Sequence, residues 1–411
     1  MAQKMLRINK RLVGPGHPTY IIFEVASTHG NDWETARAYV DQAATVGADA
    51  IKLQLFTADG LINPLTPGLK GTYDYFKTAE TPHQWFPKLK VLCDEKGIDL
   101  LCTPFDIGSA TFLDEVGVPA VKNASGELTN LQLLESIAKF GKPIIASTGM
   151  ATMGEVKRAV NIFRSNGARE IALLQCVLVY PTSFEDANVS AMNTLGKTFD
   201  TVIGYSDNGS AGALVPLMAV AMGASIIEKH VTSKKDRGSL DDKFSMSVEE
   251  FGAMIQRIRA IDARQDRKEV LKELRKEFGA DFDKALGDGI KRPAPHGTVV
   301  THPGIEGSYT MREADERQWA RRGVYLKQAI SKGTRVEKDM LVLLRPDVGI
   351  SGIEYESVVG KVAGEDVPAL LPLKMEGDAI LRFHRSDIRE TYTDPSEASF
   401  VQTLEKDALF E

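Results

Sequence analysis

The sequence has few of the residues that mark several protein classes. It contains 3 cysteines in 411 residues, Cys93, Cys102 and Cys176, which cannot all pair and lack the spacing of a zinc site. We therefore expect reduced cysteines in an apolar core. Lys and Arg number 50 against 56 Asp and Glu, which gives a formal net charge of −6 at pH 7. The excess of positive charge that binds nucleic acid or anionic membranes is absent.

Long apolar runs are also absent. No stretch approaches the roughly 20 apolar residues that cross a bilayer, and the basic residues in 1–10 are not followed by the apolar segment of a secretory leader. The length is sufficient for one large core and a smaller domain. Together these features predict a cytoplasmic protein whose partner is a small molecule, with no nucleic acid or membrane partner.

What the sequence does contain is a regular alternation of elements. Short apolar or β-branched runs alternate with segments of helical spacing up to about residue 230, which predicts parallel strands joined by helices. The runs are 20–25, 48–55, 99–103, 120–122, 143–147, 171–177, 201–206 and 225–230. Eight such strands close a (β/α)8 TIM barrel. An open doubly wound sheet shows the same alternation, but "EVASTHGND" after the first run is not its glycine-rich phosphate loop, so the barrel is favoured.

The composition changes at about residue 264. Residues 264–279 form a charged, helix-forming run, and a loop-rich segment follows it. Short β-like pieces with glycine turns come next. We therefore predict an α/β barrel over residues 1–263, a charged helix and linker over 264–318, a small β-rich domain over 319–376, and a tail over 377–411 without an assigned structure.

Polar side chains lie where the predicted strands end, which is where barrel active sites form. Lys52 and Lys122 lie in apolar runs. An unpaired ammonium in a barrel core is costly, so these lysines imply an anionic partner, either a protein carboxylate or a bound substrate. Lysines and hydroxyls together suit a ligand with a phosphate and a carboxylate, such as phosphoenolpyruvate. The hydroxyls are those of Thr103, Ser125, Ser147 and Ser206.

Three further side chains have the chemistry for proton transfer. Glu24 and Glu127 offer carboxylates that move a proton or hold a sugar hydroxyl, and His230 offers an acid, a base or a metal ligand. Taken alone, His230 is equally well explained as a hydrogen-bonded histidine at the end of a strand. The combination of these residues is more informative than any one of them.

Eight motifs in consistent order between residues 20 and 250 resemble those of the sialic acid synthase family. They are "EVASTHGND", "ADAIKLQLF", "LLCTPFD", "VKNASGE", "IIASTGM", "VYPTSFED", "IGYSDNG" and "IIEKHVT". "ARRGVYLKQAISKG" and "VLLRPDVGISGIEYESVVGK" resemble the family's C-terminal antifreeze-like (SAF) domain. The family condenses phosphoenolpyruvate with an N-acetylated amino sugar. The resemblance thus implies a transferase that makes a nonulosonic (sialic-type) acid and phosphate.

The resemblance also implies a role for particular positions. It places the phosphate of phosphoenolpyruvate at Lys122, Ser125, Ser147 and Ser206, and its carboxylate at Lys52 and Thr103. It places Glu24, Gln54, Glu127, Tyr180 and Asp241 around the reacting sugar. Arg322 resembles an arginine that the antifreeze-like domain of one subunit presents to the barrel of its partner. The resemblance therefore implies a domain-exchanged homodimer.

One departure from the family concerns a metal. The family reads S-D-H after its seventh strand, where this chain has Ser206, Asp207 and Asn208, while His230 matches the second metal-binding histidine. An amide oxygen is a poorer ligand for a transition metal but is acceptable to a hard cation. Related octulosonate phosphate synthases occur with and without a metal. Whether His230 and Asn208 hold a divalent metal, Mn²⁺ or Mg²⁺, is therefore undecided at this point.

Two other functions remain as alternatives at this point. One is a Schiff-base aldolase that uses Lys52 or Lys122 on pyruvate. The other is a catalytically silent sugar-binding homologue, with Asn208 marking the loss of activity. The accepted sugar is also open, because N-acetylmannosamine, diacetamido-trideoxyhexoses and phosphorylated variants all fit the same phosphoenolpyruvate geometry. The sequence does not decide whether His230 or Glu127 is the general acid. It also does not decide whether Glu24 or a metal activates the water.

Overall fold

The computed structural model describes residues 5–66, 70–209, 212–234, 239–300, 309–384 and 387. Its largest element is one sheet of parallel strands in the order β5–β4–β3–β10–β9–β8–β7–β6. These strands are β3 (Tyr20–Glu24), β4 (Ala50–Leu55), β5 (Asp99–Pro104), β6 (Val121–Asn123), β7 (Ile144–Ser147), β8 (Ile171–Cys176), β9 (Val202–Asp207) and β10 (Ile226–Thr232). Each lies within two residues of a predicted run. The order of the eight strands confirms the predicted TIM barrel.

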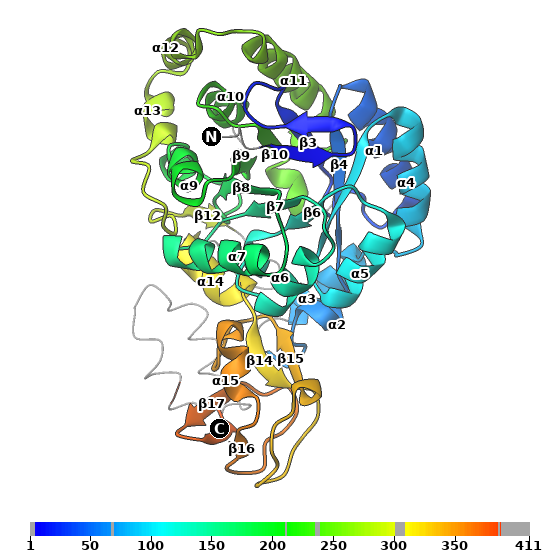
Figure 1. Cartoon of the computed structure of the whole chain (residues 1–411), viewed down its shortest axis with the longest axis vertical. Coiled ribbons are helices and arrows are strands. Elements are labelled where there is room, and N and C mark those ends of the chain that lie inside the picture. Colours follow the sequence, from blue (N-terminus) through cyan, green and yellow to red (C-terminus); the bar gives the residue numbers. More distant parts are fainter. Residues whose placement is uncertain are drawn as a thin grey trace.

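Helices cover the outside of the sheet (Figure 1). The larger ones are α1 (Trp33–Thr45), α4 (Trp85–Lys96), α5 (Ile107–Val116), α6 (Leu131–Ala138), α7 (Met153–Ser165), α9 (Ala191–Phe199), α10 (Leu214–Ala221) and α11 (Val248–Asp262). In α7, a capping box of Thr152 and Glu155 starts the helix. Its buried side chains recur at helical spacing and pack on the sheet: Val156, Ala159, Val160 and Phe163. Such amphipathic helices explain why the strands themselves are apolar on both faces.

Short elements close one end of the barrel and surround the other. The hairpin β1 (Leu6–Ile8) and β2 (Arg11–Val13) packs against inward-facing residues such as Tyr20 and Ile22, and so seals the amino ends of the strands. The carboxyl ends carry α2 (Ala58–Leu61), α3 (Lys70–Ala79), η1 (Ser125–Glu127), α8 (Phe184–Ala187), η2 (Leu240–Lys243) and β11 (Met246–Ser247). The barrel is therefore accessible from its carboxyl end.

The charged run after residue 264 forms α12 (Arg267–Phe278), and α13 (Ala280–Leu286) follows it. Val270 and Leu274 of α12 join the barrel's outer core. The chain continues through β12 (Thr298–Val300), β13 (Tyr309–Met311) and α14 (Glu313–Ala320). Figure 1 shows α14 where the barrel meets the smaller domain. Residues 301–308 of the predicted linker lie outside the described residues.

The smaller domain is built mostly from short strands. The strands β14 (Gly323–Leu326) and β15 (Leu341–Leu344) form an antiparallel pair. The strands β16 (Val362–Ala363), β17 (Leu373–Glu376) and β18 (Ala379–Arg382) form a second sheet, with η3 (Lys338–Met340), η4 (Gly352–Glu354) and α15 (Tyr355–Val358) beside them. Thus the first part of the segment 377–411 pairs with this domain. Residues 385, 386 and 388–411 lie outside the described residues.

Two expectations from composition concern the whole chain. Cys93, Cys102 and Cys176 are free and buried, which confirms the prediction of reduced core cysteines. In the described ranges, we find no helix whose length and apolarity would let it pass through a bilayer.

Candidate active site

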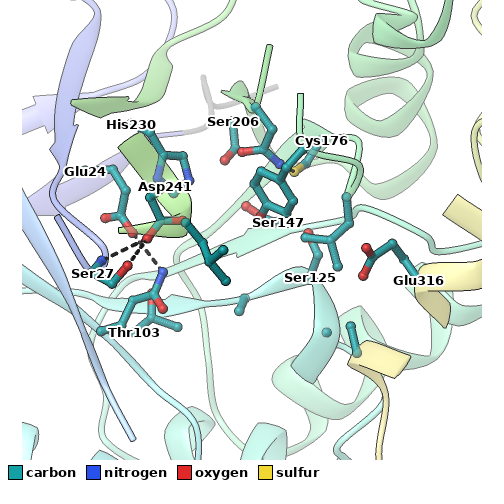
Figure 2. A pocket seen from close by; sticks show the side chains of 18 of the residues that line it. Glu24, Ser27, Thr103, Ser125, Ser147, Cys176, Ser206, His230, Asp241 and Glu316 are labelled. Atoms are coloured by element: carbon teal, nitrogen blue, oxygen red, sulfur yellow. Dashed lines mark hydrogen bonds between the residues drawn. The ribbon is translucent and has the colours of Figure 1, made fainter. Parts of the chain in front are cut away.

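A cavity of about 370 Å³ opens at the carboxyl ends of the strands, a volume in the range of small-molecule sites. Figure 2 shows side chains from several strands and loops pointing into it. The cavity is lined by every predicted site residue except Glu127 and Arg322. These are Glu24, Lys52, Gln54, Thr103, Lys122, Ser125, Ser147, Tyr180, Ser206, Asn208, His230 and Asp241. The fold thus brings together residues that are far apart in the sequence.

Two buried lysines and two buried glutamates form a charged cluster in this cavity. Lys52 Nζ lies 2.9 Å from Glu24 Oε2 and 3.8 Å from Glu228 Oε1. Lys122 Nζ lies 3.6 Å from the same oxygen of Glu228. Protein carboxylates are therefore one anionic partner of both lysines. This arrangement offsets part of the free energy that burying the ammonium groups costs.

The cluster shifts the pKa values of its members in different directions. Burial lowers the pKa of Lys52, but the charges of Glu228 and Glu24 outweigh this effect and place it above its ordinary value. Burial also lowers the pKa of Lys122, and the charge of Lys52 keeps it low although Glu228 opposes the shift. Burial acts to raise the pKa of Glu228, but Lys122 and Lys52 hold it below its ordinary value. Burial raises the pKa of Glu24 to about 7, with Lys52 opposing and Glu228 adding to the shift. Glu24 is thus the member that exchanges a proton near neutral pH.

Each lysine also holds a hydroxyl in place. Lys122 Nζ donates to Ser147 Oγ at 2.7 Å, and Lys52 Nζ donates to Thr103 Oγ1 at 3.1 Å. The two pairs lie on neighbouring strands of the barrel, β6 with β7 and β4 with β5. Each pair presents an ammonium and a hydroxyl together, a combination suited to an anionic oxygen.

Two further serines complete the polar wall. Ser206 Oγ donates to Glu228 Oε1 at 2.9 Å, and the backbone N–H of Gly149 donates to Ser125 Oγ at 2.9 Å. Figure 2 shows Ser125, Ser147 and Ser206 around the same space. These hydroxyl groups thus lie on different strands and loops of the cavity, beside the ammonium groups of Lys52 and Lys122.

His230 is a neutral base in this environment. Burial lowers its pKa to about 3, and the charge of Lys52 adds to the effect. Its Nδ1 is buried without a hydrogen-bond partner in the described ranges. The ring lies against Phe244 and Tyr180, at centroid distances of 5.0 and 6.0 Å. A histidine with so low a pKa does not serve as a cationic acid at neutral pH.

Asp241 in η2 is held by a small network that includes Ser27 and Tyr75. The backbone N–H of Ser27 donates to Asp241 Oδ2 at 3.0 Å, and the Ser27 hydroxyl donates to the same atom. The hydroxyl of Tyr75 in α3 lies 3.0 Å from Ser27 Oγ and accepts from the N–H of Leu240 at 3.0 Å. Burial raises the pKa of Asp241, while the bonds from Ser27 lower it. The network closes the side of the cavity next to Glu24 (Figure 2).

Glu127 and Arg322 meet beside the cavity instead of lining it. Arg322 Nε donates to Glu127 Oε2 at 2.7 Å, and Arg345 Nη2 donates to Oε1 at 3.3 Å. Asn130 Nδ2 donates to Oε2 at 2.9 Å. Burial acts to raise the pKa of Glu127, but the two arginines hold it below its ordinary value. Such a carboxylate stays ionised, so Glu127 is not a general acid in this arrangement.

The structure holds one chain, and in it Arg322 contacts the barrel of that same chain. Within this chain Arg322 also donates to the backbone oxygens of Gly60 and Phe105 in the barrel and of Leu343 in the smaller domain. A Cβ on Gly126 would lie 2.7 Å from Ala320 O and 2.9 Å from Arg345 Nη2. The end of α14 and Arg345 therefore pack closely on η1. An exchange of this domain between two copies stays a prediction.

Several residues of the cavity have no counterpart among those predicted. Glu228 lies two positions before His230 on β10. Side chains two positions apart in a strand lie on the same face, so the position of His230 could have predicted that Glu228 also faces the cavity. Phe56, Phe76 and Phe105 follow or face the strand ends, whereas Glu316, Trp319 and Arg345 come from α14 and the smaller domain. We find no local sequence signal that would have indicated this last group.

The two metal ligands implied by the sequence, His230 and Asn208, are fewer than the protein ligands that a transition-metal centre usually has. Asn208 Nδ2 donates to Val177 O at 2.7 Å, which fixes the amide and leaves its oxygen as the ligand atom. Together with His230 it offers one nitrogen and one oxygen. In the described part of the chain, no group of three or more His, Cys, Asp or Glu side chains is placed to hold a metal ion. Transition-metal sites in proteins use three or four such ligands.

The buried carboxyl of Glu316 predicts a dependence of stability on pH. Burial raises its pKa to about 8, although the charge of Arg345 opposes the shift. The folded chain then keeps this proton to a higher pH than the unfolded chain, so the free energy of unfolding falls as pH rises from about 4.5 to about 8. Glu316→Gln should remove this loss and be more stable than the wild type by about 2 to 4 kcal/mol at pH 9. Urea unfolding of both proteins at pH 5, 7 and 9 measures this difference in the free energy of unfolding. A difference between variant and wild type that does not grow with pH would contradict the prediction.

Both parts of the chain, the barrel and the smaller domain, are similar to known protein families. The model of the NeuB family matches residues 39–269, and that of the SAF domain matches residues 321–376. An uncharacterised protein of Methanocaldococcus jannaschii is 36% identical over 86% of this chain and 92% of its own. An N,N'-diacetyllegionaminic acid synthase of Campylobacter jejuni is 34% identical over 84% of this chain and 96% of its own. The crystal structure of the spore coat polysaccharide biosynthesis protein SpsE of Bacillus subtilis has a TM-score of 0.74 and 30% identity, covering 92% of this chain and 99% of that one.

Proposed function

The chain belongs to the NeuB family, and from this membership and the chemistry of its cavity we propose that it condenses phosphoenolpyruvate with an N-acetylated amino sugar. Its relatives include synthases of legionaminic, pseudaminic and N-acetylneuraminic-type acids, so the reaction class is a carbon–carbon bond-forming transfer. The products are a nonulosonic acid and phosphate. The observation that carries the proposal is the cluster of two lysines and four hydroxyl groups in one cavity.

The charge of the cluster supports an anionic substrate. With Glu24 ionised, the charges of Lys52 and Lys122 balance those of Glu24 and Glu228. With Glu24 protonated, one positive charge is in excess. Binding of an anion and protonation of Glu24 therefore favour each other. We assign the carboxylate of phosphoenolpyruvate to Lys52 and Thr103.

The phosphate of phosphoenolpyruvate is assigned to the other lysine and the serines. Lys122 and Ser147 are hydrogen-bonded at 2.7 Å, and Lys122 shares Glu228 with Lys52. Ser125 and Ser206 line the same cavity. Hydroxyl and ammonium donors are the groups that bind a phosphate without competing negative charge.

Glu24 is the proposed acid and base of the reaction. C3 of phosphoenolpyruvate attacks the aldehyde carbon, and the aldehyde oxygen takes the proton of Glu24. Water adds to the cation that forms at C2 and returns a proton to the Glu24 carboxylate. The C2 hydroxyl then gives its proton to the bridging oxygen while the C–O bond breaks, so that C2 becomes a ketone and phosphate leaves. A pKa of about 7 suits a group that both gives and takes a proton.

The test of this function is phosphate release from phosphoenolpyruvate with a panel of N-acetylated amino sugars. We expect release only when a sugar is present, with one sugar acid formed per phosphate. Borohydride treatment with pyruvate should leave the lysines unmodified. Binding of phosphoenolpyruvate without release would instead indicate a silent binding protein, and a pyruvate adduct on Lys52 or Lys122 would indicate a Schiff-base aldolase.

We write the proposed steps with this chain's own side chains, because His230 and Asn208 offer one nitrogen and one amide oxygen and no carboxylate between them, a weak donor set for a transition metal and for Mg²⁺ alike. We therefore expect excess EDTA to change the rate of phosphate release by less than about twofold. The measurement compares chelated enzyme with enzyme to which Mn²⁺ or Mg²⁺ has been added back. A rate that falls at least tenfold on chelation and returns with one cation would contradict this prediction.

A homodimer with exchanged SAF domains is a separate proposal. An exchanged domain makes the same contacts between two chains as it makes within one. The pair of Arg322 and Glu127 would then join the two copies. Light scattering in solution tests this proposal. We expect twice the chain mass of 45.0 kDa, and the mass of a single chain would contradict the proposal.

A further inference from the structure

The outer part of the cavity has an aromatic wall, formed by Phe56, Phe76, Phe105 and Trp319. The ring of Phe56 lies 5.4 Å from that of Phe76 and 5.7 Å from that of Phe105, between centroids. The ring of Trp319 in α14 lies 6.3 Å from that of Phe76 in α3. These rings pack on one another and also border the cavity. They offer apolar surface that phosphoenolpyruvate does not need.

Glu316 borders the same space from α14. It precedes Trp319 by three positions, so the two side chains share one face of the helix. The side chain is buried, and among the described residues no hydrogen bond holds its carboxyl. Figure 2 shows it on the far side of the pocket from Glu24, His230 and Asp241, beyond Ser125. The reaction proposed above leaves this carboxyl unused.

Arg345 supplies a donor at the same place. One of its terminal nitrogens, Nη2, donates to Glu127, while its Nε is buried and without a partner in the described ranges. Its guanidinium lies over the ring of Phe105, 5.5 Å from the centroid. Glu316 and Arg345 act on each other electrostatically, yet the described chain shows no ion pair between them within 4.0 Å. Glu316 and Arg345 thus border the same part of the cavity without being paired to each other.

A carboxyl, a guanidinium N–H and aromatic faces together match an acylamino group. The amide C=O accepts from the guanidinium, the amide N–H donates to the carboxyl, and the acyl methyl group packs on the rings. A phosphate at this place would leave the aromatic surface uncovered, and so would a sugar hydroxyl. The observed groups thus favour an acylamino substituent over either.

We propose that Glu316, Trp319 and Arg345 bind an acylamino group of the sugar that is remote from its aldehyde. This inference rests on the proposed function, in which the aldehyde reacts beside Glu24. The preferred substrate is then a hexose that carries two acylamino groups and no phosphate. Glu316, Trp319 and Arg345 act as specificity-determining residues and take no part in bond formation.

The test compares two sugars with three forms of the full chain. The sugars are a 2,4-diacetamido-2,4,6-trideoxyhexose and N-acetylmannosamine, and the forms are the wild type, Glu316→Leu and Glu316→Gln. We expect the wild type to prefer the diacetamido sugar by at least tenfold in kcat/KM. Glu316→Leu should reduce that preference at least tenfold, because it removes the polar partner of the amide. Glu316→Gln keeps a donor and an acceptor and should retain most of it. The KM for phosphoenolpyruvate should stay the same in all three.

The outcomes separate this inference from the function on which it rests. Equal use of both sugars by the wild type, or an equal loss on both sugars in Glu316→Leu, overturns the inference and leaves the synthase activity in place. A changed KM for phosphoenolpyruvate in Glu316→Leu assigns Glu316 to the anion site and likewise overturns it. Absence of phosphate release with every sugar overturns the proposed function together with the inference.

Discussion

Lys122→Met should lower kcat/KM for phosphoenolpyruvate by about 10³-fold, which corresponds to roughly 4 kcal/mol of transition-state stabilisation. Lys122 is buried, donates to Ser147 and lies 3.6 Å from Glu228. Without its ammonium group, the phosphate would face the Glu228 carboxylate with one cation fewer. The measurement is phosphate release at saturating sugar over a range of phosphoenolpyruvate concentrations.

Lys291→Met is the matched control for this variant. Lys291 is also buried, but it does not line the cavity, and its Nζ has no hydrogen-bond partner among the described residues. Because its ammonium makes no hydrogen bond in the described part of the chain and does not face the cavity, Lys291→Met should leave kcat/KM within about twofold. If both variants lost activity equally, the effect of Lys122 would come from burial alone and the assignment of the phosphate would be wrong.

Arg322→Met should lower the free energy of unfolding by about 3 to 5 kcal/mol, as expected when one partner of a buried ion pair is removed. Glu127 is fully buried and loses its 2.7 Å partner in this variant. Three backbone oxygens lose their donor as well, those of Gly60, Phe105 and Leu343. Urea unfolding followed by circular dichroism measures the change.

Two further variants show whether this loss belongs to the pair. In Arg322→Met with Glu127→Gln, the unpaired charge is gone, so we expect at least about 1 kcal/mol of the lost stability to return. Lys361→Ala removes the pair with Asp378, whose carboxylate is exposed, and should cost much less stability than Arg322→Met. A loss in Arg322→Met as small as that in Lys361→Ala would contradict the assigned role of Arg322.

The barrel and most of the cavity could be predicted from the sequence because they depend on local patterns. Strand runs and the helices between them fix the order of the sheet, and active-site side chains then lie at the strand ends. The face of each strand was harder to predict. Lys229 lies in the same kind of apolar run as Lys52, yet it points away from the cavity and pairs with Asp207 at 2.8 Å. Its neighbours Glu228 and His230 point inward.

The contribution of the C-terminal part could not be predicted in the same way. Glu316, Trp319 and Arg345 reach the cavity only because α14 and the smaller domain dock on η1 and α3. Such docking depends on contacts between distant segments, for which no periodicity or motif is a signal. The motif around Arg322 indicated an arginine near the site. The structure places its guanidinium beside the cavity, on Glu127.

The central claim is that one cluster of cationic and hydroxyl groups binds phosphoenolpyruvate and consumes it by breaking its C–O bond. Its most direct test uses phosphoenolpyruvate with oxygen-18 at the bridging position, incubated with the enzyme and an acetylated amino sugar, followed by mass spectrometry of both products. We predict that the heavy oxygen is recovered in the released phosphate and that the C2 oxygen of the sugar acid comes from water. Recovery of the label in the sugar acid would contradict the account.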